Sequence, residues 1–589
     1  MPSEHYAAFI EEAFVKPIRS VLIVDDDYPT FDEILDRQIQ HKADQEFREA
    51  KEWYNNPARI KKVIESFRAP PRPLLVDIHD GSNVDAGAEV LVASHLHQSD
   101  LLVLDYQLDR TKTGDGSLAI KIIRSLASNN HFNLVVVNTN ETIDTVFQSI
   151  VISLLSAGPE ILSDEEEAKA KDLVEAEELN TDGFSDTIFN SINIDQYLFY
   201  RLRPDGYIRS IGKGEQPFSS YKAASPTTWN IDQLRLVAKY LLNRVQRDYK
   251  DKFGPNSAPS VEWSSGSVKW IRTDSIFVAF SPKEKGADLL EELQLALNAW
   301  KPEPSRLFLA KLRAEMDEYG VMAQEPALGH RHARAHWYDR LISAGGPERK
   351  SLIAESVSRH SDRLLSEILP RVEAFATGLV ENDAATGSAN DLCKGHFNVD
   401  LNKAEVRLRA EQEHNAFVCS KPPEGWHLTT GHIFTLKDEF WACLSPACDT
   451  VPSQLSDALV ASFGERLPFI AVKLHPISDT KTPEDIQLNR FVFLELDKVI
   501  KGFSFNPGSA TTAPTWHRMF ADKRGKFLPD FHLDILNTEI SSRGLTYKKH
   551  RAVVVSQLRY EYALNLIHRL GTSFTRVGLD FVAPLPAQK

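Results

Sequence analysis

Cysteine is scarce in this chain, and long apolar runs are absent. Four cysteines occur among 589 residues, all between Cys393 and Cys448. So small and local a set argues against the disulfide framework of a secreted protein. No run of 18 apolar residues occurs, and the first residues, Met-Pro-Ser-Glu-His-Tyr, show no basic segment followed by an apolar one. We therefore expect neither a membrane-spanning helix nor a signal peptide, and we expect the chain to be cytoplasmic.

Net positive charge is also lacking. The chain carries 68 Lys and Arg against 82 Asp and Glu, a formal net charge of −14. This charge argues against a protein coated all over with nucleic acid, although it is compatible with a local basic patch. The content of 42% hydrophobic and 25% charged residues is ordinary for a globular protein, and the length suggests three or four domains.

The stretch from Asp100 to Gly116 organises the rest of the sequence. Its four consecutive apolar residues, Leu101 to Leu104, are too few for a helix and predict a strand buried on both faces, as in a parallel sheet. The strand ends at Asp105, and a loop rich in Gly and Asp follows. Ligands of open α/β sheets lie at the carboxyl ends of strands, so Asp105 is a candidate site residue.

A second strand ends in the same way. Ser20 to Val24 is apolar after its first residue and leads into Asp25, Asp26 and Asp27. Adjacent parallel strands with such ends would gather three or four carboxylates in one crevice. Crowded like charges do not all stay ionised without a cation, and oxygen-only ligands suit Mg²⁺. The sequence therefore predicts a magnesium site.

Together with two further segments, these strands resemble the phosphoacceptor receiver domain of two-component response regulators, over roughly residues 17 to 210. Val-Leu-Ile-Val-Asp-Asp is similar to the first strand and acid pair of the family, and Leu-Leu-Val-Leu-Asp105 is similar to its phosphoacceptor strand. Leu134 to Glu141 is similar to the fourth strand. Tyr197 to Pro204 matches an aromatic-x-x-Lys-Pro pattern, with Arg203 in place of the Lys.

The resemblance implies a role for each of these residues. The Mg²⁺ ligands would be oxygen donors from Asp25, Asp26, Asp105 and the backbone carbonyl of Gln107. Asp105 would accept a phosphoryl group from a histidine kinase or a phosphotransfer protein, and the Thr139 hydroxyl and Arg203 would bind its oxygens. Arg in place of Lys is not a conservative change, because a guanidinium is a planar fork rather than a point charge.

The expected architecture is a multidomain α/β protein. It has an N-terminal doubly wound, five-stranded parallel sheet of receiver type with helical insertions, a middle α/β and helical region, and a C-terminal β-rich domain, similar to a small barrel, that ends in a helix. The expected domains are an N-terminal helix (1–16), the receiver (17–212, with insertions at about 31–70 and 158–195), a small α/β domain (213–303), a helical connector (304–384) and the β-rich domain (385–589).

Two charged segments each have two interpretations. Ser163 to Leu179 holds eight acids against two lysines, which indicates a solvated acidic helix or a docking face for a basic partner. The last helix, expected over Arg543 to Arg576, holds seven Lys or Arg and one acid, Glu561. It would present a solvated basic face, or it would contact nucleic acid or the acidic segment.

Cysteine and histidine residues suggest two possible metal sites, each with a structural alternative. Cys393, His396, Cys443 and Cys448 could assemble a zinc site, although no paired Cys-x-x-Cys knuckle is present; the alternative is buried or idle thiols. His332 and His336 lie one helical turn apart, either as metal ligands or on a basic solvated helix face.

Three classes of function follow. The first is a signalling protein controlled by phosphorylation at Asp105. The second is a nucleic-acid-binding regulator that acts through the basic C-terminal helix. The third is a regulated effector enzyme, although no separate catalytic domain is recognised in the sequence. The enlarged receiver also resembles those of bacterial conflict systems, in particular the buffering regulator of the Detocs antiphage system, which would imply a phosphate sink or switch in antiphage defence.

Overall fold

The structure is a computed structural model of the chain. It describes residues 4–30, 33, 57–69, 71–79, 81, 99–109, 112, 114–129, 131–204, 206–255, 260–283, 288–451, 457–477, 491–507, 513–542 and 544–574. Most of the predicted insertion at 31–70 therefore lies outside the described residues. The chain divides into two compact units, Met1–Glu318 with Ala374–Asn382, and Tyr319–Glu373 with Asp383–Lys589. No helix within the described ranges is both long and apolar enough to cross a membrane.

The first unit is built around one mixed sheet. Its described strands follow the order β2-β1-β3-β4-β7-β6-β5, in which β1 to β4 and β7 are parallel and β6 and β5 are antiparallel. The strands are β1 (Ser20–Val24), β2 (Leu75–His79), β3 (Leu101–Asp105), β4 (Asn133–Thr139), β5 (Glu262–Ser264), β6 (Trp270–Arg272) and β7 (Ile276–Pro282). The predicted parallel sheet is confirmed, and β1, β3 and β4 lie where the sequence placed strands.

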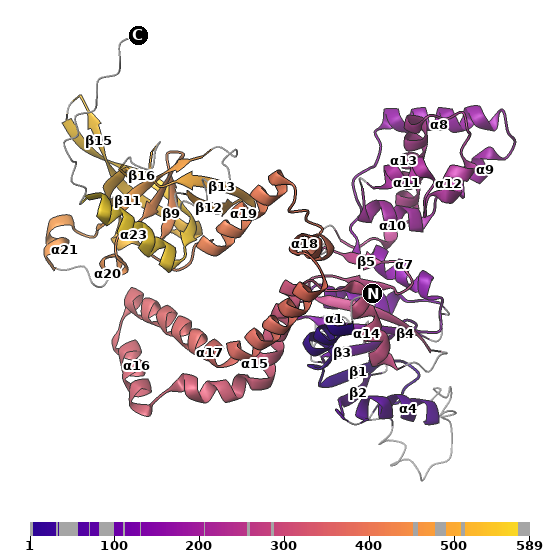
Figure 1. Cartoon of the computed structure of the whole chain (residues 1–589), viewed down its shortest axis with the longest axis horizontal. Coiled ribbons are helices and arrows are strands. Elements are labelled where there is room, and N and C mark those ends of the chain that lie inside the picture. Colours follow the sequence, from indigo (N-terminus) through magenta and orange to yellow (C-terminus); the bar gives the residue numbers. More distant parts are fainter. Residues whose placement is uncertain are drawn as a thin grey trace. The chain divides into compact units, whose positions relative to one another are not determined.

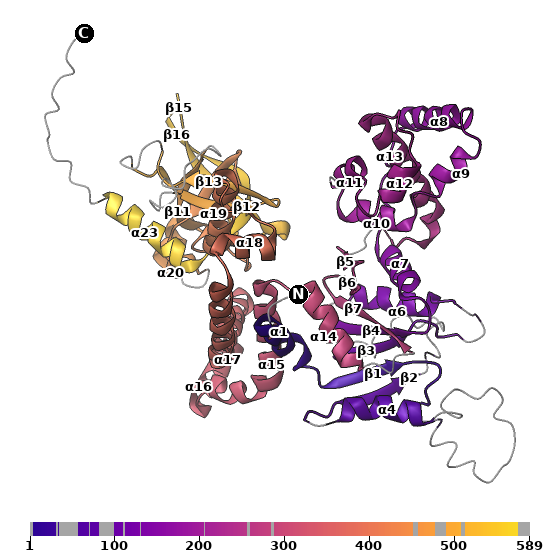
Figure 2. The same cartoon turned by 45° about the vertical axis from the view of Figure 1, so that its right-hand side comes forward.

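Helices cover both faces of this sheet (Figures 1 and 2). Side chains alternate along β1, so Leu22 and Val24 belong to one core and Val21 and Ile23 to the other. The first core is covered by α6 (Ser117–Ala127) and α7 (Ile143–Leu154). The second is covered by α1 (Glu4–Ile10), the π-helix η1 (Glu11–Val15), α4 (Pro57–Arg68), α14 (Leu289–Trp300) and the start of α15 (Pro304–Leu328).

Along the chain, a group of helices follows α7 and precedes β5 (Figure 1). It comprises α8 (Asp164–Glu178), α9 (Phe184–Phe189), α10 (Ile194–Leu202), α11 (Tyr207–Lys213), α12 (Ser219–Ala224), α13 (Ile231–Asp248) and the 3-10 helix η2 (Lys250–Lys252). The acidic helix predicted near residue 163 is α8, which begins with a capping box between Ser163 and Glu166. The insertion thus runs well past the predicted end at residue 195.

The position of β7 corrects the predicted domain boundary at residue 212. Residues 213–303 are predicted from the sequence to form a separate small α/β domain, but β5, β6 and β7 pair in the same sheet as β1 to β4. β7 lies directly beside β4, with Asn133 opposite Ile276 and Thr139 opposite Pro282. The parallel sheet is therefore completed only after the helical insertion.

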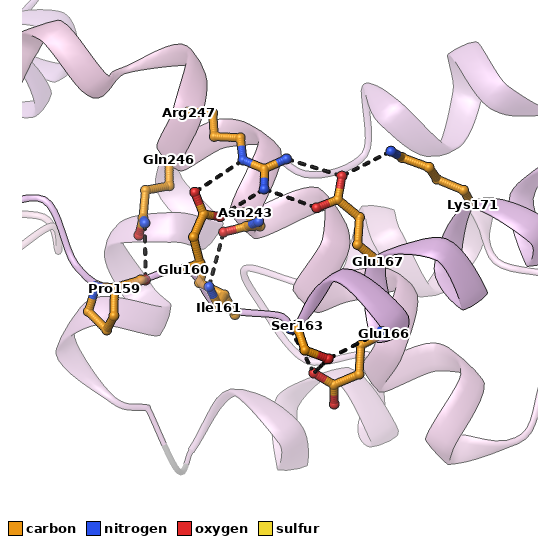
Figure 3. A network of polar contacts seen from close by, with 10 residues as sticks. All are labelled: Pro159, Glu160, Ile161, Ser163, Glu166, Glu167, Lys171, Asn243, Gln246 and Arg247. Carbon is orange, nitrogen blue, oxygen red and sulfur yellow. Dashed lines mark hydrogen bonds and ion pairs between the residues drawn. The ribbon is translucent and has the colours of Figure 1, made fainter.

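The two ends of the insertion meet in a narrow neck. The Gly254 N–H donates to the Leu155 carbonyl at 2.8 Å, and Ser156 pairs with Gly254 as an isolated bridge. The chain that leaves the neck is held on α13 by the polar contacts in Figure 3, in which Asn243 accepts from the Ile161 N–H at 3.1 Å. The other contacts are those of Gln246 with the Pro159 carbonyl at 3.2 Å and of Arg247 with Glu160 and Glu167 at 2.9 and 3.0 Å.

The second unit begins with helices and continues as a barrel. Its helices are α16 (Arg331–Ser343), α17 (Gly346–Thr386, shared with the first unit), α18 (Ala389–Phe397), α19 (Ala404–Cys419), α20 (Ala447–Thr450), α21 (Asp457–Phe463), η4 (Lys523–Gly525), η5 (Pro529–Phe531) and α23 (Tyr560–Phe574). Apolar and charged residues alternate from Glu405 to Arg409 as they would in a strand, but this stretch belongs to α19 because it lies inside a longer run of good helix formers.

The β-rich domain is a barrel, as predicted. Among its described strands, β9, β16, β15, β14, β11 and β10 pair in a closed ring, to which β8 and the β12–β13 hairpin are added. The strands are β8 (Ser420–Lys421), β9 (His432–Leu436), β10 (Glu439–Cys443), β11 (Leu467–Pro476), β12 (Phe491–Leu496), β13 (Val499–Ser504), β14 (Trp516–Ala521), β15 (His532–Ser541) and β16 (Gly544–Leu558). One apolar core fills the ring, and a second joins it to α19 and α23.

The basic C-terminal segment is not one helix. Residues 544–558 form β16, paired with β15, and only Tyr560–Phe574 is helical. Lys548 forms an ion pair with Glu539 at 2.9 Å, and Lys549 and Arg551 form pairs with Asp534 at 3.1 and 3.0 Å. These three side chains therefore lie beside the acids Glu539 and Asp534 on a β-hairpin, and not on one face of a helix as predicted.

The neck yields a prediction about stability. A Cβ atom at Gly254 would lie 2.5 Å from the Ser153 carbonyl oxygen, which is backbone and cannot swing aside. Gly254→Ala should therefore destabilise the first unit by about 1–3 kcal/mol. Gly212→Ala is the matched control, because this residue lies in α11 and its nearest outside neighbour is an ordinary 3.4 Å from a Cβ. Equal thermal unfolding of the two variants would contradict the packing described for the neck.

Candidate functional site

The carboxyl ends of three parallel strands bring the candidate site together. Asp25 follows β1, Asp105 ends β3, and Lys283 follows β7. The registers align these ends, because Val24 pairs with Leu104 and Asp105 pairs with Asn138, which in turn pairs with Ser281. Residues more than 250 positions apart in the sequence therefore meet at one edge of the sheet.

The predicted acid cluster is present at this edge. Asp25 and Asp105 are buried and Asp26 is half-buried, and each offers a ligand atom within 4.8 Å of the others. The backbone orients Asp25, whose N–H donates to the His79 carbonyl at 3.0 Å and whose Oδ1 accepts from the Asp27 N–H at 2.9 Å. A set of three carboxylates supplies only hard oxygen donors, so the residues fit Mg²⁺.

Lys283 lies between two of these carboxylates. Its Nζ is 2.9 Å from Asp25 Oδ2 and 2.7 Å from Asp105 Oδ2, and all three side chains are less than 10% exposed. A buried charge is costly unless it is paired and hydrogen-bonded, and here each charged group has an opposite partner within hydrogen-bonding distance. The cation beside these carboxylates is thus Lys283, the residue that follows β7.

Burial and charge move the pKa values of this group in a consistent way. Burial raises the pKa of Asp105 to about 7, and repulsion from Asp25 and Asp26 adds to this, although Lys283 acts in the opposite direction. Burial by itself would lower the pKa of Lys283, but attraction to Asp25 and Asp105 outweighs it, so the pKa is raised. The ammonium therefore stays charged, while the Asp105 carboxyl is held close to its titration point at neutral pH.

Thr139 and Gln107 lie at the same edge of the sheet. Thr139 is the buried last residue of β4, and its Oγ1 accepts from the Glu141 N–H at 3.0 Å. The Gln107 N–H donates to Asp105 Oδ1 at 3.4 Å, and its side-chain amide donates to the Lys112 carbonyl at 3.5 Å. The predicted use of the Gln107 carbonyl as a metal ligand stays a prediction.

Arg203 does not lie where the sequence analysis expected it. It is the exposed residue that caps α10 in the helical insertion, and no strand ends there. The same aromatic-x-x-basic spacing recurs at Phe280 and Lys283, where a buried strand does end. Lys283 was missed because β7 was assigned to another domain. The available signal was an apolar strand followed by a charged residue, as at Asp25 and Asp105.

Gly116 packs closely against Tyr106, the residue that follows Asp105. The buried ring of Tyr106 lies against Gly116 so closely that a Cβ at this position would be 2.0 Å from the ring. Tyr106 is thus packed against the loop that precedes α6, and burial raises the pKa of its hydroxyl above the ordinary value.

The other candidate metal sites are not assembled. In the described parts of the chain, the group of three or more His, Cys, Asp or Glu that could hold an ion is the cluster of Asp25, Asp26 and Asp105. Cys443 is fully buried in the barrel, Cys448 is exposed and Cys393 is half-buried. His332 and His336 are exposed on α16. The zinc interpretation therefore has no support among the described residues.

The raised pKa of Asp105 predicts how the stability of β3 depends on pH in metal-free solution. The folded chain keeps a proton on Asp105 that the unfolded chain releases near its ordinary pKa of 3.8. Stability should therefore fall as pH rises from about 4 to about 7, by up to about 4 kcal/mol for the full shift. Asp105→Asn should remove this component, as measured by hydrogen exchange of β3 with a chelator present. Asp77→Asn, an exposed position on β2, should keep it, and parallel profiles for all three proteins would contradict the assignment.

A comparison with protein families agrees with this geometry. Residues 17–187 match the family model described as Response receiver domain. No curated protein and no solved structure matched the chain. The matched range contains the acid cluster and Thr139 and ends inside the helical insertion, before β7 and Lys283. The resemblance seen in the sequence is thereby confirmed, and this chain contains a response receiver domain.

Proposed function

We propose that Asp105 accepts a phosphoryl group in a Mg²⁺-dependent reaction, as part of a response-regulator-like signalling protein. The observation that carries this proposal is the buried Asp105 carboxylate, 2.7 Å from the Lys283 ammonium and within the cluster of Asp25 and Asp26. The receiver domain implies a kinase or phosphotransfer partner in general. The finer proposal is that the donor is the phosphohistidine of a histidine kinase or of a phosphotransfer protein.

The chemistry is a displacement at phosphorus. A carboxylate oxygen of Asp105 forms a bond to the phosphorus atom, the nitrogen–phosphorus bond of the donor breaks, and the released imidazole takes up a proton. The product on this chain is an acyl phosphate. Asp25, Asp26 and Asp105 would hold Mg²⁺, which supplies positive charge for the oxygens of the transferring group.

The pKa of Asp105 explains why cations are needed. The nucleophile is the ionised carboxylate, but without a metal its pKa of about 7 leaves much of it protonated at neutral pH. Positive charge favours the ionised form and also stabilises the charge that builds up on the phosphoryl oxygens. We propose that Lys283 exchanges its contact with Asp105 for a phosphoryl oxygen, and that the Thr139 hydroxyl binds another.

The role of this acceptor in the cell is a finer proposal. The resemblance to conflict-system receivers, including the buffering regulator of the Detocs system, supports a phosphate sink or switch in antiphage defence. The large helical insertion between β4 and β7 is in keeping with an enlarged receiver. A nucleic-acid-binding role gains no support from Lys548, Lys549 and Arg551, which are paired with acids.

The acid cluster yields a prediction on metal affinity. Asp26→Asn removes one anionic oxygen donor from the three that meet at the site, so Mg²⁺ binding measured by calorimetry should weaken by at least about tenfold. Asp77→Asn removes an exposed carboxylate of the same sheet and should leave the affinity unchanged. Equal affinities for wild type and Asp26→Asn would remove Asp26 from the site.

Phosphorylation itself separates the two candidate cations. After incubation with Mg²⁺ and acetyl phosphate, intact-mass spectrometry should show one added phosphoryl group on the wild type and none on Asp105→Asn. Lys283→Ala should slow the reaction by on the order of 10²-fold, since a buried cation at the transferring group is lost. Arg203→Ala should react at the wild-type rate, because Arg203 lies on α10.

Two results would contradict this assignment. If Arg203→Ala is slow and Lys283→Ala is not, the cation has been assigned to the wrong residue. If the wild type gains no phosphoryl group, or Asp105→Asn gains it equally well, the receiver is not a phosphoacceptor.

A further inference from the structure

The helices that follow the receiver form an arm without a core of its own. The arm is defined here as residues 319–367, which comprise the end of α15, all of α16 and the first half of α17 (Figure 1). Within it, the buried side chains among those described are Ala323 and Ala344, and α16 buries none. Helical segments of this length are marginal in water without tertiary packing, so the arm needs a cover.

Contacts within the arm fix α16 against α17. The Trp337 indole N–H donates to Ser356 Oγ at 2.7 Å, and its ring lies 5.3 Å from the His360 ring. The Arg349 guanidinium donates to the carbonyls of Leu341 and Ile342 at the end of α16, at 3.0 and 2.8 Å. The two helices therefore present a defined surface, although their contact buries little apolar area.

An apolar stripe on α17 runs along this surface. Ile353, Val357, Leu364 and Ile368 lie on one side of the helix at spacings of 4, 7 and 4 residues. Ile368 is completely buried and Leu364 is half-buried, but Val357 is 61% and Ile353 45% exposed. The chain covers the C-terminal end of its own stripe and leaves the other end open.

The exposed apolar area is of the size that a stable dimer requires. Seven large apolar side chains of the arm are at least 39% exposed: Val321, Met322, Trp337, Tyr338, Ile342, Ile353 and Val357. At roughly 60 Å² each they supply on the order of 400 Å². A standard interface buries about 800 Å² per partner, of which somewhat more than half is apolar.

The charge of the arm favours a second copy of this chain as the cover. The arm holds seven Lys or Arg and six Asp or Glu, a net charge of +1, whereas the whole chain carries −14. Two copies repel each other over most of their surface, but not at the arm. A nearly neutral surface with interleaved charges of both signs can pair with itself about a twofold axis, whereas an acidic or a basic partner would select one sign.

We propose that two copies of this chain associate through the arm, with the open end of the stripe on each α17 covered by the arm of the other copy. The association rests on Ile353 and Val357 and does not depend on the phosphoacceptor function of Asp105.

Sedimentation equilibrium of the full chain at micromolar concentrations tests this interface. The wild type should sediment as a dimer. Combined Ile353→Asp and Val357→Asp should weaken the dimer by at least about 100-fold, because each introduces a carboxylate that dimerisation would have to bury. Leu179→Asp is the control: this side chain is 89% exposed beyond the end of α8 in the first unit, and its replacement should leave the dimer intact.

If circular dichroism shows that the double variant loses helix content, its failure to dimerise could reflect misfolding. Photo-crosslinking of the otherwise wild-type chain then tests the interface. A photo-crosslinking amino acid placed at position 357 of the otherwise wild-type chain should give a crosslinked dimer, and one placed at position 179 should not. A monomeric wild type overturns the proposal. So does a dimer that the double variant retains, or equal crosslinking from both positions.

Discussion

The ammonium group of Lys283 lies between the carboxylates of Asp25 and Asp105, and all three are buried. Removing such charges from water costs several kcal/mol per ion, which only close opposite charges offset. The three residues come from strands that are far apart in the sequence, so the pairing holds only when β1, β3 and β7 are all in register. The sheet and its site therefore depend on each other. Burial makes an opposite charge such as that of Lys283 necessary to offset the cost of the two carboxylates. The same burial raises the pKa of Asp105 to about 7.

The helical insertion shows how a distant strand can complete this site. Between β4 and β7 the chain forms α7, the insertion, β5 and β6, yet β7 pairs with β4 along its whole length. The entropy of closing a loop grows only slowly with its length, so a long insertion costs little more than a short one when its ends are held together. The neck between Leu155 and Gly254 holds them. The family match ends within the insertion, at residue 187, so it covers neither β7 nor Lys283.

The second unit contains two structures of opposite character. The barrel closes on itself and fills its ring with an apolar core, and ion pairs across the β15–β16 hairpin join Lys549 and Arg551 to Asp534. The arm has two defined helix–helix contacts but almost no buried side chains in its described part. The barrel is stabilised by its own closed ring of strands. The arm needs a second surface to cover its exposed apolar side chains, so we expect copies of the chain to associate there.

The sequence by itself determined the strands whose local pattern is unambiguous. Four apolar residues that end in a carboxylate identified β3, and the same logic identified β1 and the acids of the cluster. It could not choose between two sites with the same aromatic-x-x-basic spacing, Tyr200 to Arg203 and Phe280 to Lys283. Tertiary structure decided between them, because only β7 pairs with β4, and that pairing joins residues more than 130 positions apart. The basic residues 548, 549 and 551 were likewise given to a helix, since the partner strand that makes them a hairpin is not visible in their own spacing. Local propensity and pattern set which segments become strands or helices. Which strand ends meet is set by burial and hydrogen bonding between distant segments, and the candidate site lies where those ends meet.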